Sequence, residues 1–308
     1  MPHTVAVAGT TPRTIMCAKA LLSHPEFEIS FVITPAPKPI GRDRKFTENQ
    51  FQVFANSNQL PTVLIKNKVD EEVKKEISKF KRPDFLLVVD FGYLVPGWLL
   101  DLPKIMPLNI HPSALPKWRG SSPGQFVLLS GEKESAVSVI EMTPQFDQGP
   151  IVWQKKFAVN QSWTQSEYYQ FSFELVCKEL SKIMLGLANG KIIPLPQPTT
   201  SPTALAWRIT KQNAFVDWKK IKQAMGGGDK KRGDKYSGDK YSAELERASR
   251  AYSPWPLLWT KILTNKGLRR MQIISAHVGQ NEQLVLEKVK IEGMKIKPWN
   301  EVKNVIKN

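Results

Sequence analysis

Residues 4–9 read TVAVAG and are followed at once by TTP. A short apolar run that ends in a glycine-containing turn is typical of a buried first strand. Residues 13–23 continue with helical spacing, and residues 28–34 (EISFVIT) form the next strand-like run. A buried strand, a helix and a second strand predict the start of an α/β domain with a parallel sheet.

Two further apolar runs extend this pattern. Residues 84–89 (DFLLVV) follow a charged helical segment at residues 69–81, and residues 105–111 (IMPLNIH) come next. Strands that alternate with helices in this way predict a Rossmann-like, mostly parallel sheet with helices on both faces.

The same domain is expected to continue through two more strands and a long helix. Residues 136–142 and 151–159 have strand-like composition and are separated by a turn-rich loop. Thr164 and Glu167 have the spacing of a capping box, which predicts a helix that begins there and runs to about Leu187.

A proline-rich segment divides the chain. Residues 193–203 (IPLPQPTTSPT) carry four prolines and no charged side chain, which is typical of a linker. We therefore expect a catalytic domain over residues 1–192, a linker over 193–205 and a C-terminal domain over 206–308. Short alternating runs such as residues 284–291 predict a small OB-like β-barrel in the last of these.

The C-terminal domain also contains a low-complexity insertion. Residues 226–242 read GGGDKKRGDKYSGDKYS and repeat the unit GDKYS. Such a segment buries little apolar surface, so we expect a mobile basic loop there. Residues 214–218 (AFVDW) and 270–275 (RMQIIS) on either side of it predict strands.

The net charge of +16 is unevenly divided between the two parts. Residues 1–200 carry 22 basic and 18 acidic side chains, a net of +4, whereas residues 201–308 carry 22 and 10, a net of +12. A basic domain favours a polyanionic partner, nucleic acid before an anionic membrane surface. Two cysteines are too few for a disulfide framework or a structural zinc site, and no apolar run approaches the roughly 20 residues of a membrane span. We expect a cytoplasmic protein without a secretory signal or membrane attachment.

The best candidates for chemistry stand at the end of a predicted strand. Asn109 and His111 are two residues apart, so their side chains point to the same side of the strand. Ligands of open α/β sheets bind beyond the carboxyl ends of the strands. A carboxylate is expected to orient the imidazole, and Asp147, within the turn sequence QFDQGP, is the best placed. Spacing alone does not join Asp147 to His111.

These residues resemble the signature of a known family. Residues 109–120 (NIHPSALPKWRG) are similar to the pattern of the folate-dependent formyltransferases, which is Asn-x-His followed by Ser-Leu-Leu-Pro, with a distant Asp before a Gly. The ending WRG is most similar to the members that act on methionyl-tRNA. Residues 8–10, 39–42, 88–96 and 250–256 match further parts of their pattern, so the resemblance covers nearly the whole chain.

The resemblance implies a reaction. The formyl group of 10-formyltetrahydrofolate would move to the α-amino group of methionine on initiator tRNA, with no metal required. In that reaction Asn109 would stabilise the oxyanion of the tetrahedral intermediate, and His111 would act as a base near neutral pH. Asp147 would hold His111 in the productive tautomer. We expect the enzyme to be a monomer.

The same resemblance assigns two sets of binding residues. The tetrahydrofolate site is expected to be lined by Phe91, Gly92, Leu94, Val95, Ser113, Ala114, Leu115 and Pro116. The tRNA acceptor stem is expected to contact a basic loop over residues 37–49 through Lys38, Arg42, Arg44 and Lys45. Gln148 stands where the family has a Thr, and Ala114 where it has a Leu, so local hydrogen bonding and apolar contact must differ.

Three other functions share some of these features. A formyltransferase for an amino-sugar nucleotide shares the catalytic domain, but a small substrate needs neither the +12 region nor the basic loop. A non-catalytic RNA-binding relative does not need Asn109, His111 and Asp147 together. A serine hydrolase needs a strained Gly-x-Ser-x-Gly turn around its nucleophile, which Ser113 lacks.

Overall fold

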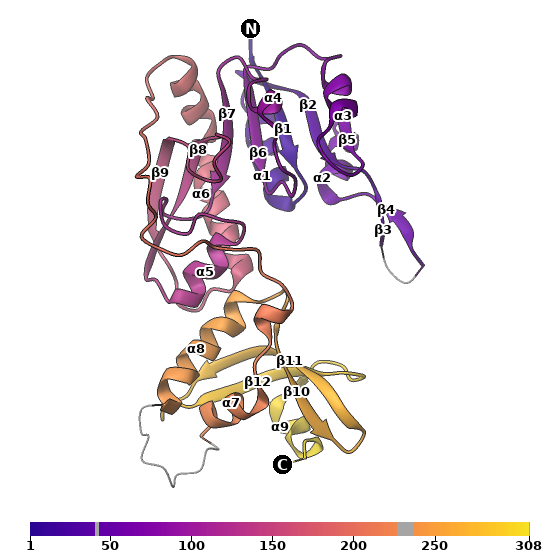
Figure 1. Ribbon diagram of the computed structural model, residues 1–308, viewed down its shortest axis with the longest axis vertical. Helices are drawn as coiled ribbons and strands as arrows, with labels where there is room; N and C mark the ends of the chain where they lie inside the picture. Colours follow the sequence, from indigo (N-terminus) through magenta and orange to yellow (C-terminus); the bar gives the residue numbers. More distant parts are fainter. Residues whose placement is uncertain (41–42, 227–236, 308) are drawn as a thin grey trace. The chain divides into compact units, whose positions relative to one another are not determined.

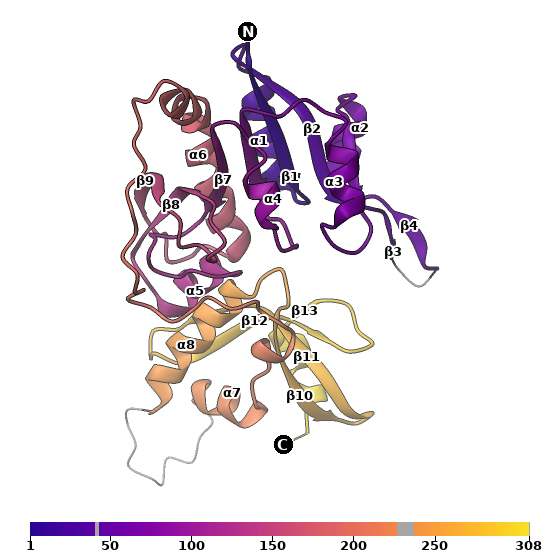
Figure 2. The ribbon, with the colours of Figure 1, turned by 45° about the horizontal axis from the view of Figure 1, so that its top comes forward.

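The computed structural model describes residues 1–40, 43–226 and 237–307 (Figures 1 and 2). The chain forms two compact units, and each combines segments that are distant in the sequence. The first unit comprises Met1–Arg119, Ala136–Phe157 and Gln170–Ala204; the second comprises Gly120–Ser135, Ala158–Tyr169 and Leu205–Asn308.

A seven-stranded sheet has the order β5-β2-β1-β6-β7-β8-β9. The neighbours from β5 to β7 pair in parallel, and β7 pairs with β8 in the antiparallel sense. The predicted Rossmann-like, mostly parallel fold is therefore confirmed. The strands are β1 (His3–Gly9), β2 (Phe27–Pro35), β5 (Thr62–Ile65), β6 (Phe85–Val89), β7 (Met106–His111), β8 (Glu134–Glu141) and β9 (Ile151–Ala158).

Helices cover both faces of this sheet, because its central strands are apolar on both sides. Ala6 and Ala8 of β1 belong to one core, and Val5 and Val7 alternate with them and are buried on the opposite face. The first core is completed by α3 (Glu71–Ile77) and α4 (Gly97–Leu100), whereas α1 (Pro12–Leu22) packs on β1, β2 and β6 beside α2 (Gln50–Ser57). The long helix α6 (Gln165–Ala188) has the bounds that the capping box predicts.

The expected basic loop is a β-hairpin. Strands β3 (Lys38–Ile40) and β4 (Lys45–Thr47) pair in the antiparallel sense, with Lys38 opposite Thr47. The hairpin projects from the β5 edge of its unit in both views (Figures 1 and 2).

The second unit contains the predicted β-rich C-terminal part. Its sheet has the order β10-β11-β12-β13, with antiparallel pairing throughout, and helices α7 and α8 pack against it. The elements are α7 (Trp218–Ala224), α8 (Ser237–Ala251), β10 (Leu258–Thr264), β11 (Gly267–Val278), β12 (Leu284–Ile291), β13 (Lys297–Pro298) and α9 (Trp299–Val302).

Two expectations for this unit are wrong in part. Residues 214–218 do not form a regular strand: Ala214 ends a short 3₁₀ helix, Phe215 makes a single bridge to Trp259, and Trp218 begins α7. Asp217 caps that helix by accepting from the Lys219 backbone N–H, which outweighs the strand-like run before it. Of the low-complexity insertion 226–242, residues 227–236 lie outside the described residues, and residues from 237 onward belong to α8.

The last division between the two units falls at Ala204 and Leu205, at the C-terminal end of the predicted linker, but the second unit also includes two earlier segments, Gly120–Ser135 and Ala158–Tyr169. Helix α5 (Pro123–Ser130) packs against α8 and therefore belongs with the C-terminal part, as does the start of α6. The proline-rich segment, in contrast, belongs up to Ala204 to the unit that holds the large sheet.

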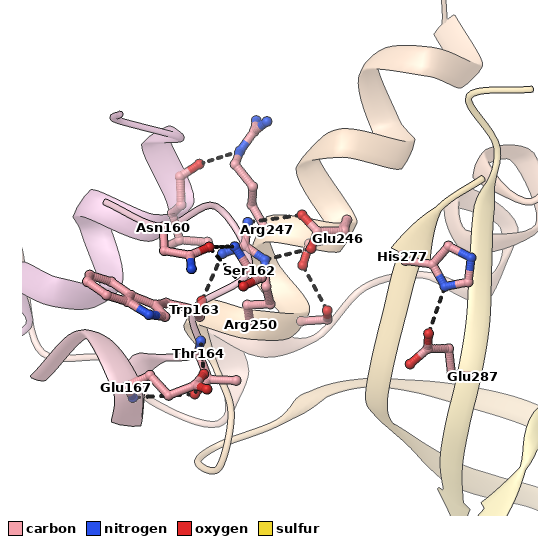
Figure 3. Close-up of polar contacts among 12 residues, drawn as sticks. Asn160, Ser162, Trp163, Thr164, Glu167, Glu246, Arg247, Arg250, His277 and Glu287 are labelled. Carbon is pink, nitrogen blue, oxygen red and sulfur yellow. Dashed lines mark hydrogen bonds and ion pairs between the residues drawn. The ribbon is translucent and has the colours of Figure 1, made fainter. Parts of the chain in front are cut away.

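Two arginines of α8 form hydrogen bonds with other segments of the second unit (Figure 3). Arg250 makes two hydrogen bonds with the Glu246 carboxylate and donates to the Trp163 carbonyl at 2.8 Å. Arg247 donates to the Leu129 carbonyl at the end of α5, at 3.0 Å. Bidentate Arg–carboxylate pairs hold geometry as well as charge. Among the described residues, no helix combines the length and apolar character needed to cross a bilayer.

The capping box of α6 makes a pH-dependent contribution to stability. The Thr164 backbone N–H and hydroxyl both donate to Glu167 at 2.7 Å, and the backbone bond in particular holds the pKa of the Glu167 carboxyl below its ordinary value (Figure 3). A lowered folded-state pKa gives stability that is present at neutral pH and is lost as pH falls through that pKa.

We expect Glu167→Gln to lower the melting temperature at pH 7 and to have a smaller effect at acidic pH, once the pH has fallen below the lowered pKa of the Glu167 carboxyl and the parent is also protonated. Thermal unfolding followed by circular dichroism across this range measures the difference. The exposed Glu174, which accepts from Gln170, supplies the control variant Glu174→Gln. An equal cost of Glu167→Gln at both pH values would contradict the assignment.

Candidate active site

Two side chains of strand β7 and one from the loop between β8 and β9 make up the site at the end of β7. Asn109 and His111 occupy alternate positions of this strand, and His111 lies opposite Ser138 of β8. Asp147 lies in the loop between β8 and β9 and has φ +53°, in the left-handed region. Its carboxylate Oδ2 is 3.6 Å from His111 Nδ1, and the two side chains are only 8% and 4% exposed.

The other ring nitrogen of His111 is held by the backbone. His111 Nε2 lies 3.0 Å from the carbonyl oxygen of Trp118. A carbonyl oxygen can only accept, so this contact requires the proton on Nε2. In the neutral ring the basic lone pair is therefore on Nδ1, the nitrogen that faces Asp147.

This arrangement corrects one expectation. The sequence analysis gives Asp147 the task of fixing the tautomer, whereas in the structure the Trp118 carbonyl does so. The 3.6 Å separation between Nδ1 and Oδ2 is an ion-pair distance, longer than a direct hydrogen bond. Asp147 is thus placed to stabilise the doubly protonated ring.

Asn109 offers a free polar group beside this pair. Its side chain is partly exposed, and its carboxamide makes no hydrogen bond within the described residues. A carboxamide N–H on the same face as His111 can donate to an oxygen atom bound near the ring. The catalytic roles of the three residues stay predictions.

The loop after β7 is shaped by its own buried groups. The Ser113 hydroxyl donates to the Lys117 carbonyl at 2.7 Å, and the Ser138 hydroxyl donates to the Ser113 carbonyl at the same distance. Ser113 and Leu115 are buried, so both shape the loop, whereas Ala114 and Pro116 are partly exposed and can face a ligand. The Ser113 hydroxyl is buried and donates to the backbone, an arrangement that favours a structural role over that of a nucleophile.

The loop after β6 presents apolar side chains at the same end of the sheet. Leu94 is 86% exposed, and Phe91 and Val95 pack partly against the core below. A Cβ atom at Gly92 would meet nothing within 4 Å, so there is open space beside the backbone. The expected folate residues of this loop thus form a partly open apolar surface.

The expected RNA-binding residues lie on the β3–β4 hairpin or beside it. Lys38, Arg44 and Lys45 are exposed, and Lys38 lies over the ring of Tyr93, 5.8 Å from its centroid. Arg42 lies outside the described residues. Phe46, next to Lys45 and opposite Pro39 in the hairpin, is 72% exposed.

Sequence reasoning missed two residues that support the site. Arg119 is 6% exposed, and its guanidinium donates to Gln197 Oε1, while Gln197 Nε2 donates to the carbonyls of Asp147 and Gly149. Arg119 stands within the quoted WRG sequence, which was a usable signal. Gln197 gave none, because it lies in the segment taken as a linker.

The sequence pattern of the formyl transferase family matches residues 4–179, more than half of the chain. This span contains β7, the loop that follows it and Asp147. The chain belongs to the formyl transferase family. This chain is 28% identical over 257 residues to a methionyl-tRNA formyltransferase of Legionella pneumophila (strain Corby). The alignment covers 83% of this chain and 74% of that relative.

Solved structures share the fold of this formyl transferase. A methionyl-tRNA formyltransferase from Clostridium thermocellum superposes with a TM-score of 0.55 at 15% identity, over 94% of this chain and 98% of that one. An N-formyltransferase from Helicobacter canadensis, in complex with folinic acid and dTDP-3-aminofucose, gives 0.58 at 19% identity, over 91% and 88%.

The Asp147 loop of the formyl transferase depends on a glycine. A Cβ atom at Gly149 would lie 1.8 Å from the Glu141 carbonyl oxygen, so any side chain there forces the loop away from β8. We expect Gly149→Ala to destabilise the fold by about 1–3 kcal/mol, as overpacking does, and to move Asp147 from His111. Urea unfolding measures the cost. Gly97→Ala is the control, because a Cβ atom there meets nothing within 4 Å; equal stability of the two variants would contradict the argument.

Proposed function

We propose that this chain transfers the formyl group of 10-formyltetrahydrofolate to the α-amino group of methionyl-tRNA. The observation that carries the proposal is the placement of the His111 ring, whose Nε2 lies 3.0 Å from the Trp118 carbonyl oxygen and whose Nδ1 lies 3.6 Å from Asp147 Oδ2. Membership of the formyl transferase family and the names of the relatives support the same reaction.

The proposed acid–base work falls to His111. An amine attacks as the neutral base, so the bond from its nitrogen to the formyl carbon leaves a surplus proton on nitrogen. His111 Nδ1 takes that proton. The imidazolium then donates from Nε2 to Trp118 and lies beside the Asp147 carboxylate, which stabilises the positive charge. Returning the proton to the departing nitrogen, as its bond to the formyl carbon breaks, regenerates the neutral ring.

The negative charge of the intermediate is assigned to Asn109. Attack on a formyl carbon places charge on the formyl oxygen, and a carboxamide N–H stabilises such an oxyanion. Loss of one donor of this kind typically costs about 2.7–4 kcal/mol of barrier height. The partly exposed side chain of Asn109, on the same face as His111, fits this role.

The donor site is proposed at the loops that follow β6 and β7. A folate carries a flat ring system, and the exposed Leu94, the partly exposed Phe91 and Val95 and the open space at Gly92 suit such a ring. Ala114 and Pro116 add apolar surface from the second loop. When bound, the donor supplies the activated formyl group.

The positive charge of the C-terminal part and of the hairpin supports an RNA as the acceptor. Residues 201–308 carry a net charge of +12, and Lys38, Arg44 and Lys45 expose three cations on the hairpin. Phosphate contacts of such cations position nucleic acids and make their binding sensitive to salt. Arg42, which follows Gly41 in the sequence and lies outside the described residues, is proposed as a further contact.

The second candidate is an amino-sugar nucleotide acceptor. It is favoured by structural similarity alone, since the Helicobacter canadensis enzyme has the same fold. Formyl transfer to methionyl-tRNA and to an amino-sugar nucleotide, measured side by side with the same formyl donor, decides between the two. Preference for the sugar nucleotide would overturn the proposal.

For the proposed base, we expect His111→Ala to lower kcat at least about 100-fold, the lower range of general acid–base catalysis. Binding of the folate and of tRNA should change little, because neither is assigned to the ring. Single-turnover formyl transfer measures the change in catalytic rate, and equilibrium titration measures binding of the folate and of tRNA. Equal turnover in variant and parent would remove His111 from the mechanism, and tight tRNA binding without turnover in the parent itself would indicate an RNA-binding relative.

For the hairpin, we expect Arg44→Glu combined with Lys45→Glu to raise KM for methionyl-tRNA at least about tenfold at physiological salt, because two phosphate-seeking cations become anions. KM for the formyl donor should not change. The matched control reverses Lys66 and Lys68, two exposed cations elsewhere in the same unit. Equal effects of the two double variants would show that the hairpin is not a specific contact.

A further inference from the structure

The proline-rich segment expected to be a linker is bonded to both loops of the active site. Leu195 and Ile151 exchange both backbone hydrogen bonds at 2.8 Å, which ties the segment to the start of β9. Farther along, Ser201 donates to the Pro116 carbonyl at 2.7 Å, and Thr203 accepts from the Trp118 backbone N–H at 2.7 Å. Residues 195–203 therefore act as a strap across the site.

Gln197 is the centre of this strap, because its carboxamide uses its donors and its acceptor at once. Its Nε2 donates to the Asp147 carbonyl at 3.1 Å and to the Gly149 carbonyl at 2.7 Å. Its Oε1 accepts from Arg119 Nη2 at 3.0 Å and from Nε at 3.3 Å. A glutamine is the one side chain of this length that offers two N–H donors and an oxygen acceptor together.

Arg119 is bound by neutral groups. Besides Gln197, its guanidinium donates to the carbonyls of Pro198 and Thr199, at 2.7 and 3.2 Å. Within the described part of the chain, this buried cation forms no ion pair. A buried cation needs its donors satisfied, so Arg119 holds the strap at the position where these three oxygens surround it.

These contacts close a ring of interactions around the catalytic pair. His111 bonds to the carbonyl of Trp118, the next residue is Arg119, Arg119 bonds to Gln197, and Gln197 bonds to the backbone of Asp147. The Asp147 side chain returns to His111 at 3.6 Å. Asp147 has a left-handed backbone, which costs a non-glycine residue free energy and persists only where the surroundings enforce it.

We propose that Gln197 is a positioning residue for formyl transfer, setting the distance between the Asp147 carboxylate and the His111 ring. The inference rests on the proposed function, because it assigns Gln197 a task within that reaction. Gln197 acts through Asp147 and does not touch substrate.

The test is Gln197→Glu, which keeps the length of the side chain and the acceptors for Arg119 but removes both donors to the Asp147 loop. We expect kcat to fall about 10- to 100-fold, as when supporting hydrogen bonds of a catalytic group are lost, with KM for the donor and for tRNA within about twofold of the parent. The matched control is Gln161→Glu, because Gln161 Nε2 also bridges two backbone carbonyls, those of Glu132 and Val159, in the second unit. That control should leave kcat unchanged.

A double-mutant cycle separates positioning from general stabilisation. In an Asp147→Asn background the carboxylate is already gone, so Gln197→Glu should add less than about a twofold further loss. Full additivity of the two losses would show a merely structural role and overturn the proposal. If Gln197→Glu does not fold, Gln197→Ala takes its place in the same cycle.

The imidazole signals of His111 in ¹⁵N nuclear magnetic resonance spectra provide a readout that needs no turnover. We expect them to move in Gln197→Glu and to stay in place in Gln161→Glu. If the parent transfers formyl to neither acceptor, the proposed function fails, and unmoved His111 signals would in addition overturn the positioning role. An active parent with an unimpaired Gln197→Glu variant would overturn this inference alone.

Discussion

The site depends on one constraint: the His111 ring is held between a carbonyl oxygen and a carboxylate that come from different loops. The Trp118 carbonyl follows β7, and Asp147 follows β8. The Trp118 carbonyl accepts a hydrogen bond from the Nε2–H of the ring, so the ring can change its protonation only at Nδ1, the nitrogen that faces Asp147. The Ser113 hydrogen bond and the close approach of Gly149 to the Glu141 carbonyl restrain the two loops and so help to keep the two ring nitrogens in different surroundings.

Much of the first unit was predictable because its strands are buried on both faces and its helices are capped. Continuous apolar runs identify β1, β6 and β7, and the Thr164–Glu167 spacing gives the start of α6. Helix α5 was not predicted, since its sequence PGQFVLLS is apolar on all sides and lacks a helical period. Strand β5 was missed because four residues are too few for an alternation to be recognised.

For the site, strand position alone brought Asn109 and His111 to one face, the turn-rich loop made Asp147 the best candidate carboxylate, and the resemblance to a family joined it to His111. The restraint on the ring could not be predicted. A backbone carbonyl has no signature in the sequence, and neither does the left-handed backbone of Trp118, which has φ +58°. Gln197 was not predicted because its segment is rich in proline and threonine, a composition typical of a linker. In the structure the carbonyls of Pro198 and Thr199 in this segment accept hydrogen bonds from the buried Arg119.

Because the second unit combines segments from distant parts of the sequence, it limits where the chain can be truncated and when it can fold during synthesis. Helix α5 and the start of α6 are synthesised long before α8, against which α5 packs. A fragment that stops at residue 204 would leave the apolar surface of α5 without that cover and should aggregate. We therefore expect that the part matched by the family pattern does not complete its folding until the last third of the polypeptide has been synthesised.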